Sequence, residues 1–307
     1  MQRRVRLGCF PNDIMNYEDI NTYDYDLDES LIAQTPIKDR DHSRLLVVDK
    51  TNGKMVDETF YNIINYLKEG DTLVLNDTKV LPSRIYGHKL DTNAKIEVLL
   101  LNEIESDNWE CLVRPQKRVH IGTTIKFNDN LSCTVTEVLK DGITHVKFNY
   151  NGIFLEELEK IGTMPLPPYI HEALKDQSRY QTVYAKNIGS AAAPTAGLHF
   201  TKELLEKIKG KNIDILYVTL NVGLGTFRPV SENDITKHDM HSELYCISKE
   251  VADKLNKAKS EGRRIIGVGT TSLRTLEANY SKYNMFKATS EKTNIFIYPP
   301  YKIKSID

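Results

Sequence analysis

Residues 191–230 read AAAPTAGLHF TKELLEKIKG KNIDILYVTL NVGLGTFRPV, and this stretch decides the fold. In order, it predicts a loop of small residues, a short amphipathic helix, an apolar strand and a second loop that contains glycine. Thr201 is a suitable N-cap for the helix, and Gly210 is suited to end it in the left-handed conformation. The β-branched run at 213–220 then predicts a strand buried on both faces, as in an α/β protein.

Glycines stand in both loops beside this helix and strand. Gly197 belongs to the first loop, and Gly223 and Gly225 belong to the second. Backbone amides approach a ligand closely where no Cβ intervenes, and ligands of open α/β sheets bind at the carboxyl ends of strands. For either loop taken alone, glycines used only to form a turn are as good an explanation as a binding site. The two loops together, with His199 and Arg228 beside them, predict a binding site.

A similar alternation of strands and helices follows this stretch. We expect a helix at 248–262, a strand at 265–269 and a last strand at 294–298. Thr270 and Thr271 lie at the next junction of strand and helix, where free amides and hydroxyls suit a carboxylate or a phosphate. The alternation predicts an α/β fold with a mostly parallel sheet and flanking helices.

Residues 80–157 have a different pattern, without helices and with polar turns between short alternating segments. The strands that we expect there lie at 84–89, 95–102, 109–113, 123–127, 133–139 and 145–150. Strands spaced by about 8–12 residues are typical of a small antiparallel β-barrel. Because α/β patterns stand on both sides, we expect a barrel domain at 80–157 inserted between two parts of an α/β domain, 1–79 and 158–307.

Composition limits the class of protein. The chain has 307 residues, 27% of them charged and 40% hydrophobic, which is typical of a globular protein of about two domains. A net charge of −1 excludes a globally basic nucleic-acid coat but permits a local basic patch. The four cysteines are far apart, which favours a reduced, cytoplasmic protein, and no apolar run approaches the roughly 18 residues of a membrane span. Residues 1–14 are expected to be an extension before a natural start at Met15.

Two groups of polar residues each have two explanations. Arg114, Lys117 and Arg118 crowd the segment RPQKRVH, either as a solvated charge cluster or as contacts to the phosphates of RNA. Asn76 and Arg84 flank the end of a predicted strand, either as ligand contacts or as turn chemistry and a solvated charge. Both alternatives stay open for each group.

The chain resembles one family closely. The motifs that carry the resemblance, in the family's order, are DYDLDESLIAQTP, SRLLVVD, GDTLVLNDTKVLPSRI, MPLPPYI, YQTVYA, AAAPTAGLHFT, VTLNVGLGTFRPV, MHSELY, VGTTSLRTLE and IFIYPPYKIKSID. They run from about Tyr23 to Asp307 and include the predicted barrel. The family is that of the S-adenosylmethionine:tRNA ribosyltransferase-isomerases of queuosine biosynthesis, for which PTAGLHF together with VGLGTFRPV is specific.

The resemblance implies a cytoplasmic enzyme that moves the ribosyl group of S-adenosylmethionine, a co-substrate, onto 7-aminomethyl-7-deazaguanine at the wobble position of tRNA. The products are epoxyqueuosine-tRNA, adenine and methionine, and no metal, other cofactor or membrane partner is expected. We expect a monomer. The family continues with a segment containing NFHLP and a final helix, which this sequence lacks, so an inactive truncated tRNA-binding fragment is the alternative.

The implied chemistry assigns roles to particular residues. A base is needed beside the ribose carbon that the sulfonium acidifies, and adenine must leave with a proton. His199 and His241 have suitable acidity, and Glu243 is a candidate base or a partner that orients a histidine, although a structural role fits each equally well. The substrate contacts that we expect are Thr195, Gly197, Gly223, Gly225 and Thr226 for the donor, Thr270, Thr271 and Arg274 for its carboxylate, and Arg84 and Arg228 for the acceptor or a phosphate.

His238 and His241 also raise the alternative of a metal-dependent hydrolase, with His199 or Glu243 completing the site. The spacing H-x-x-H lacks the i,i+4 geometry of helical zinc pairs, and no third ligand has a diagnostic spacing. The sequence therefore predicts no metal site.

Overall fold

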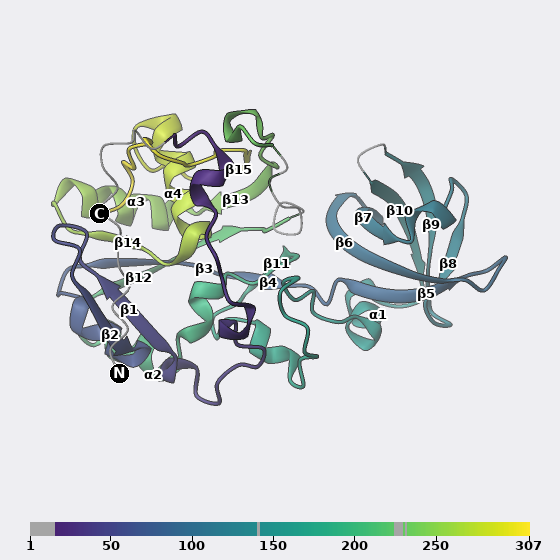
Figure 1. Cartoon of the computed structure of the whole chain (residues 1–307), viewed down its shortest axis with the longest axis horizontal. Coiled ribbons are helices and arrows are strands. Elements are labelled where there is room, and N and C mark those ends of the chain that lie inside the picture. Colours follow the sequence, from purple (N-terminus) through teal and green to yellow (C-terminus); the bar gives the residue numbers. More distant parts are fainter. Residues whose placement is uncertain (1–15, 140–141, 224–229, 231) are drawn as a thin grey trace.

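The computed structural model describes residues 16–139, 142–223, 230 and 232–307, in which two bodies lie side by side (Figure 1). The larger body contains an open sheet with its helices, and the smaller one is a barrel. The polypeptide enters the barrel after β4 (Thr78–Val80) and returns through α1 (Phe154–Ile161). The boundaries expected for an inserted domain remain a prediction, but the barrel lies between two parts of the larger body.

The open sheet is mixed. Among the described residues its five strands have the order β14–β3–β12–β13–β15. Three are parallel: β14 (Ile265–Gly267), β3 (Thr72–Asn76) and β12 (Asp214–Leu220). The other two, β13 (Glu243–Ile247) and β15 (Thr289–Thr293), add antiparallel strands at one side. The expected α/β fold is confirmed. The sheet is parallel only over β14, β3 and β12, so the prediction of a mostly parallel sheet holds for these three strands and not for β13 and β15.

Helices cover both faces of this sheet. Successive side chains of β3 point to opposite faces, so the packing of neighbouring residues shows what covers each face. Val74 packs with α3 (Lys249–Ser260) and α4 (Gly269–Tyr283), whereas Leu73 and Leu75 pack with α2. The flanking helices that the pattern predicted are therefore present on both sides. Of the helices in the described ranges, none has the length and apolar character that crossing a membrane requires.

Helix α2 (Lys202–Lys209) forms where its pattern predicted it. Thr201 Oγ1 accepts a hydrogen bond from the Leu204 N–H at 3.1 Å, as an N-cap does. Gly210 is the C-cap at which α2 ends, as predicted, but the left-handed conformation expected there is wrong: its φ of −62° is right-handed, and its N–H still bonds to Glu206 O. The left-handed residue is Asn212, with a φ of 56°, which turns the chain into β12.

The barrel is closed and antiparallel, as predicted, with the strand order β10–β7–β6–β5–β8–β9. Its strands are β5 (Arg84–Lys89), β6 (Lys95–Glu105), β7 (Asn108–Arg114), β8 (Thr124–Lys126), β9 (Leu131–Val138) and β10 (Ile143–Tyr150). Helix α1 plugs one end: the Phe154 ring lies 5.0 Å from the Phe148 ring and 5.7 Å from the Trp109 ring. Closure leaves no unpaired edge strand, so this small body has a complete core of its own.

Short elements complete the described chain. Strands β1 (Arg44–Val48) and β2 (Met55–Thr59) form a hairpin, and β4 pairs in parallel with β11 (Asn187–Ser190). The prediction of a strand at 294–298 is wrong. Strand β15 ends at Thr293, and residues after it line a cavity. The 3₁₀ turns are η1 (Ile20–Tyr23), η2 (Glu29–Leu31), η3 (Arg40–His42), η4 (Phe60–Tyr66), η5 (Gln116–Arg118), η6 (Gln177–Tyr180), η7 (Thr195–His199) and η9 (Ile235–Lys237).

Candidate functional site

The two junctions that the sequence singled out meet at one edge of the sheet. The carboxyl ends of β14, β3 and β12 lie there because the three strands are parallel. Gly269, with a φ of 79°, begins α4, and a Cβ on it would lie 3.2 Å from the Ala196 Cβ of η7. The loop around Gly197 and the start of α4 at Thr270 are therefore in contact, as a shared pocket requires.

A cavity of about 360 Å³ opens at this edge, and we call it the sheet-edge cavity. It brings together five residues that the sequence had proposed, and its remaining walls are mostly apolar. The lining residues are Val222, Met240, His241, Glu243, Thr270, Thr271, Leu273, Arg274, Ile295, Phe296 and Ile297. Four segments that are far apart in the sequence supply them.

A buried ion pair between Glu243 and Arg274 supports the wall of this cavity. Glu243 also accepts a hydrogen bond from the Gly223 N–H at 3.0 Å. Arg274 donates in addition to the carbonyls of His241 at 3.0 Å and Ile295 at 3.2 Å. Burial raises the pKa of Glu243, and the charge of Arg274 opposes that rise. Both side chains are thus committed to protein partners.

The start of α4 has the features of an anion site. Val268, at the N-cap position, provides no side-chain cap, so the N–H groups of the first turn lack partners within the helix. The hydroxyl oxygen of Thr271 is buried without a hydrogen-bond partner. Unpaired N–H groups and the helix dipole favour a negatively charged group here. Thr270 and Thr271 both line the cavity, which fits their expected role toward a carboxylate.

His199, Thr195 and Gly197 are not among the residues that line the sheet-edge cavity. His199 Nδ1 lies 2.9 Å from Ser43 Oγ, and its ring packs on Phe60 at 5.2 Å. Burial lowers the pKa of His199, which favours the neutral imidazole at neutral pH. Thr195 is exposed at the start of η7, and a Cβ on Gly197 would overlap the Tyr184 hydroxyl. Packing alone thus requires the glycine at position 197.

Asn76 has a structural role. Its Nδ2 donates to Leu220 O at 3.0 Å, and its Oδ1 accepts from the N–H groups of Thr78 and Leu220, each at 3.1 Å. The residue is 1% exposed. These bonds tie the ends of β3 and β12 together and favour the turn-chemistry alternative over a ligand contact.

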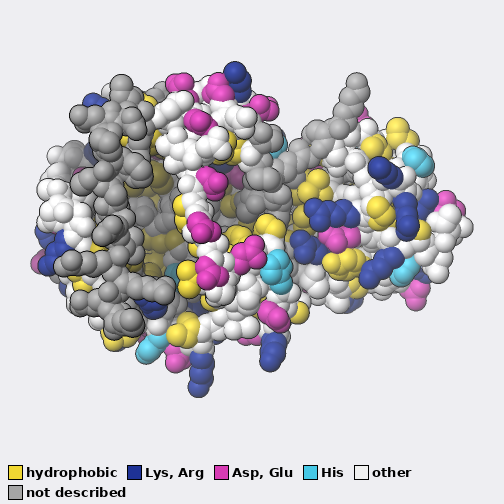
Figure 2. Space-filling model, viewed as in Figure 1, with side chains coloured by type: hydrophobic (Ala, Val, Ile, Leu, Met, Phe, Trp, Pro, Cys, Tyr) yellow, Lys and Arg dark blue, Asp and Glu magenta, His cyan; other side chains and the backbone are white. Residues whose placement is uncertain are grey.

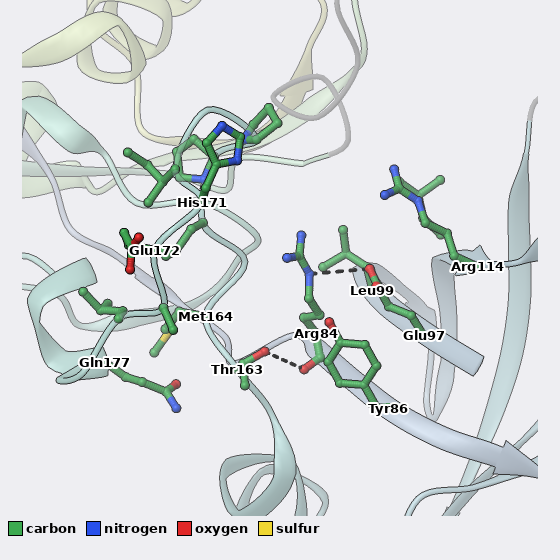
Figure 3. A pocket seen from close by; sticks show the side chains of 17 residues that line it. Arg84, Tyr86, Glu97, Leu99, Arg114, Thr163, Met164, His171, Glu172 and Gln177 are labelled. Atoms are coloured by element: carbon green, nitrogen blue, oxygen red, sulfur yellow. Dashed lines mark hydrogen bonds and ion pairs between the residues drawn. The ribbon is translucent and has the colours of Figure 1, made fainter. Parts of the chain in front are cut away.

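A second cavity, of about 620 Å³, lies between the barrel and residues 163–177, and we call it the barrel cleft (Figure 3). Arg84 joins its two sides: its N–H donates to Thr163 O at 3.2 Å, and its carbonyl accepts from the Thr163 N–H at 2.9 Å. The opposite side is held by Gln34, whose Oε1 accepts from the His171 N–H at 2.8 Å. The polar residues that line the cleft are Arg84, Tyr86, Glu97, Arg114, Thr163, His171, Glu172 and Gln177.

The basic segment at 114–118 forms part of the barrel surface. Arg114 ends β7 and lines the cleft, and Lys117 and Arg118 are exposed in η5. Lys and Arg side chains gather on the barrel face seen in Figure 2. Within the described part of the chain, none of these three cations has a carboxylate within ion-pair distance. The alternative of a contact to phosphate therefore stays open for them.

Gly225, Thr226 and Arg228 lie outside the described residues, so their predicted roles stay predictions. The His238 ring packs against the Phe296 ring at 5.7 Å. In the described ranges, no group of three or more His, Cys, Asp or Glu side chains is arranged to hold a metal ion.

Comparison with known proteins identifies the family. Residues 20–307 match the family model described as "Queuosine biosynthesis protein". The chain belongs to this family.

Its relatives in the queuosine biosynthesis family include S-adenosylmethionine:tRNA ribosyltransferase-isomerases from Staphylococcus aureus strains JH9 and MW2. Each is 55% identical over 289 residues, which make up 94% of this chain and 85% of the relative. A solved structure of S-adenosylmethionine tRNA ribosyltransferase from Thermotoga maritima is 33% identical and covers 95% of this chain and 82% of its own, with a TM-score of 0.47.

Sequence reasoning missed several lining residues in this member of the queuosine biosynthesis family. Met240 and Phe296 line the sheet-edge cavity, but no periodic pattern marks them. Glu97 and Tyr86 line the barrel cleft. The alternation of the barrel strands contained a signal for these two, because it places charged and polar residues on the outer surface. It did not indicate which part of that surface faces residues 163–177.

Substituting Arg274→Met should destabilise the protein by about 3–5 kcal/mol, because it leaves Glu243 as a buried, unpaired charge. Urea unfolding at pH 7 measures the change. Lys282→Met is the matched control, since it removes a cation from Glu291 where the lysine side chain is 55% exposed. Its effect should be at most about 1 kcal/mol. Equal losses in the two variants would contradict a stabilising role for the buried pair.

Proposed function

We propose that this chain is an S-adenosylmethionine:tRNA ribosyltransferase-isomerase. It transfers and isomerises the ribosyl group of S-adenosylmethionine onto 7-aminomethyl-7-deazaguanine at the wobble position of tRNA, giving epoxyqueuosine-tRNA, adenine and methionine. The observation that carries the proposal is 55% identity, over 94% of the chain, with relatives of that name. Two of its cavities, the sheet-edge cavity and the barrel cleft, differ in chemistry as sites for two different substrates would.

The sheet-edge cavity suits the donor. The free amides of α4, with Thr270 and Thr271, offer a site for the methionine carboxylate. The apolar walls at Met240 and Phe296 suit the uncharged parts of the molecule. Gly223, held by Glu243, places backbone close to the same edge. Thr195, Gly225 and Thr226 complete the donor contacts that we propose.

Proton transfer is assigned to His241, with Glu243 and His199 in support. His241 lines the cavity, and histidine is the side chain that most often transfers protons in general acid–base catalysis. Glu243 is paired with Arg274, so its contribution is to hold the wall and its negative charge beside His241. Arg274, which the resemblance suggested as a carboxylate ligand, acts instead by positioning Glu243 and the His241 carbonyl. His199, kept neutral by burial, is the further candidate base.

The barrel cleft suits the acceptor. Arg84 and Arg114 reach into it from the barrel strands, and Lys117 and Arg118 extend the cationic surface beyond it. Cations arranged in this way bind the phosphates of RNA and so fix its position. Arg228 is a further proposed contact. We propose that the protein acts as a cytoplasmic monomer without a metal or other cofactor.

The decisive experiment is release of adenine from S-adenosylmethionine. We expect adenine only when tRNA carries the aminomethyl-deazaguanine precursor, and none with guanine at that position. His241→Asn should lower the turnover number by about 100-fold or more, since it removes the proposed proton-transfer group. His42→Asn is the matched control and should have little effect, because this histidine is 57% exposed in η3 and does not line the cavity.

Two outcomes would contradict the proposal. Binding of the precursor tRNA without adenine release would indicate an RNA-binding chain without this activity. Stoichiometric zinc in the purified protein would instead favour a metal-dependent hydrolase.

Replacing both Lys117 and Arg118 by glutamine should weaken tRNA binding for every RNA sequence. The slope of log K against log salt should fall by about 2, one for each lost phosphate contact. Fluorescence titration of tRNA over a range of salt concentrations measures it. The matched control replaces Lys207 and Lys209 of α2, which lies at the end of the larger body away from the barrel (Figure 1). An equal change of slope in both variants would contradict a specific role for the barrel surface.

A further inference from the structure

One carboxylate stands in the middle of the cationic barrel side of the cleft. In the antiparallel register, Glu97 on β6 lies directly opposite Tyr86 on β5 and Arg114 on β7. Directly opposed residues share a face of the sheet, so the three form one row across the barrel surface. Arg84 lies in the next row, opposite Leu99. All of these side chains line the cleft (Figure 3).

Glu97 and Arg84 form only a long, partly exposed ion pair. The distance from its Oε1 to Arg84 Nε is 3.6 Å, and the two side chains are 23% and 29% exposed. Arg84 Nε is buried and makes no hydrogen bond. Tyr86, in the same row, shares a side-chain hydrogen bond with Glu97. Because Arg84 Nε makes no hydrogen bond to the carboxylate, part of the hydrogen-bonding capacity of Glu97 stays available to a ligand in the cleft.

A carboxylate at this place opposes binding of ordinary RNA. Two arginines attract phosphate, whereas Glu97 between them repels it and weakens the local positive field. Standard nucleobases are neutral and offer no charge to compensate. A ligand that pairs with both the arginines and Glu97 has a negatively charged backbone and a positively charged base.

We propose that Glu97 binds the protonated aminomethyl group of the acceptor base and so distinguishes precursor-bearing RNA from RNA with guanine at the same position. This inference rests on the proposed function, which supplies a base of this kind. A primary alkylamine is cationic at neutral pH, as the lysine side chain is. Glu97 repels the phosphates of both RNAs, but only the modified base offsets that repulsion, through a charge-assisted hydrogen bond between its ammonium group and the carboxylate.

The cleft contains a second carboxylate, Glu172, on the opposite side. It is exposed, and no described side chain forms an ion pair with it. Glu97 is the better candidate because its position is fixed by a strand of the closed barrel and by arginines on two neighbouring strands. A recognition group on a rigid element discriminates better than one on an exposed loop.

The test measures binding without S-adenosylmethionine, so that it does not depend on turnover. Two anticodon stem-loop RNAs are titrated, one with 7-aminomethyl-7-deazaguanine and one with guanine at the wobble position. Wild-type protein should prefer the modified RNA by about tenfold or more, as expected for a charged hydrogen bond. Glu97→Gln should bring the ratio of the two dissociation constants close to 1, and binding of the guanine RNA should not weaken.

Glu105→Gln is the matched control. It neutralises an exposed carboxylate on the same strand, one that accepts a hydrogen bond from Asn108 and does not line the cleft. The ratio should stay at the wild-type value, and thermal unfolding checks that both variants fold.

Three outcomes would overturn the inference. The first is an unchanged ratio in Glu97→Gln, and the second is an equal loss of affinity for both RNAs, which indicates that Glu97 only orients Arg84. The third is loss of the preference in Glu172→Gln instead. A preserved preference without any adenine release would count against the proposed function alone, so the two failures are distinguishable.

Discussion

The buried pair of Glu243 and Arg274 is the interaction on which the architecture of the sheet-edge cavity depends. Glu243 fixes the exit of β12 through the Gly223 N–H, and Arg274 fixes the entrance to β13 and the residues that follow β15 through carbonyl oxygens. Removing two charges from water has a large free-energy cost, which is offset only when nearly every donor and acceptor has a partner. The network meets that condition, and it joins the four separate segments that surround the cavity.

The two cavities present charge by different physical means. At the sheet edge, the positive end is the start of α4, where the N–H groups and the helix dipole have positions set by the backbone. In the barrel cleft, charges are carried by long side chains on strands, with Arg84 and Arg114 around Glu97. Fixed amides suit a small ligand that must be held in one orientation. Flexible arginines on a rigid barrel suit a polymer whose phosphates recur along its length.

Local patterns predicted the parts of the fold that depend on neighbours in sequence. The strand at 84–89 was predicted at both ends, because period-two alternation and turn residues define it. The helix at α2 was found from its cap and its apolar face. The errors concern pairing over long distances: the antiparallel side of the sheet depends on β13 meeting β15, and the strand expected at 294–298 is replaced by cavity lining. Gly210 ends α2 without the left-handed conformation that was expected, and the left-handed residue is Asn212, two positions later.

The sequence by itself predicted an α/β body and an antiparallel barrel, and it named five of the residues that line the sheet-edge cavity. Motifs and periodicities are local, so they specify which residue types occur and which face they share. Only the tertiary structure decided which of them meet. It gathered His241, Glu243, Thr270, Thr271 and Arg274 in one cavity, committed Asn76 to the backbone and placed Glu97 among arginines in the cleft. Those outcomes depend on strand order, register and the packing of the barrel against residues 163–177, which no local pattern encodes.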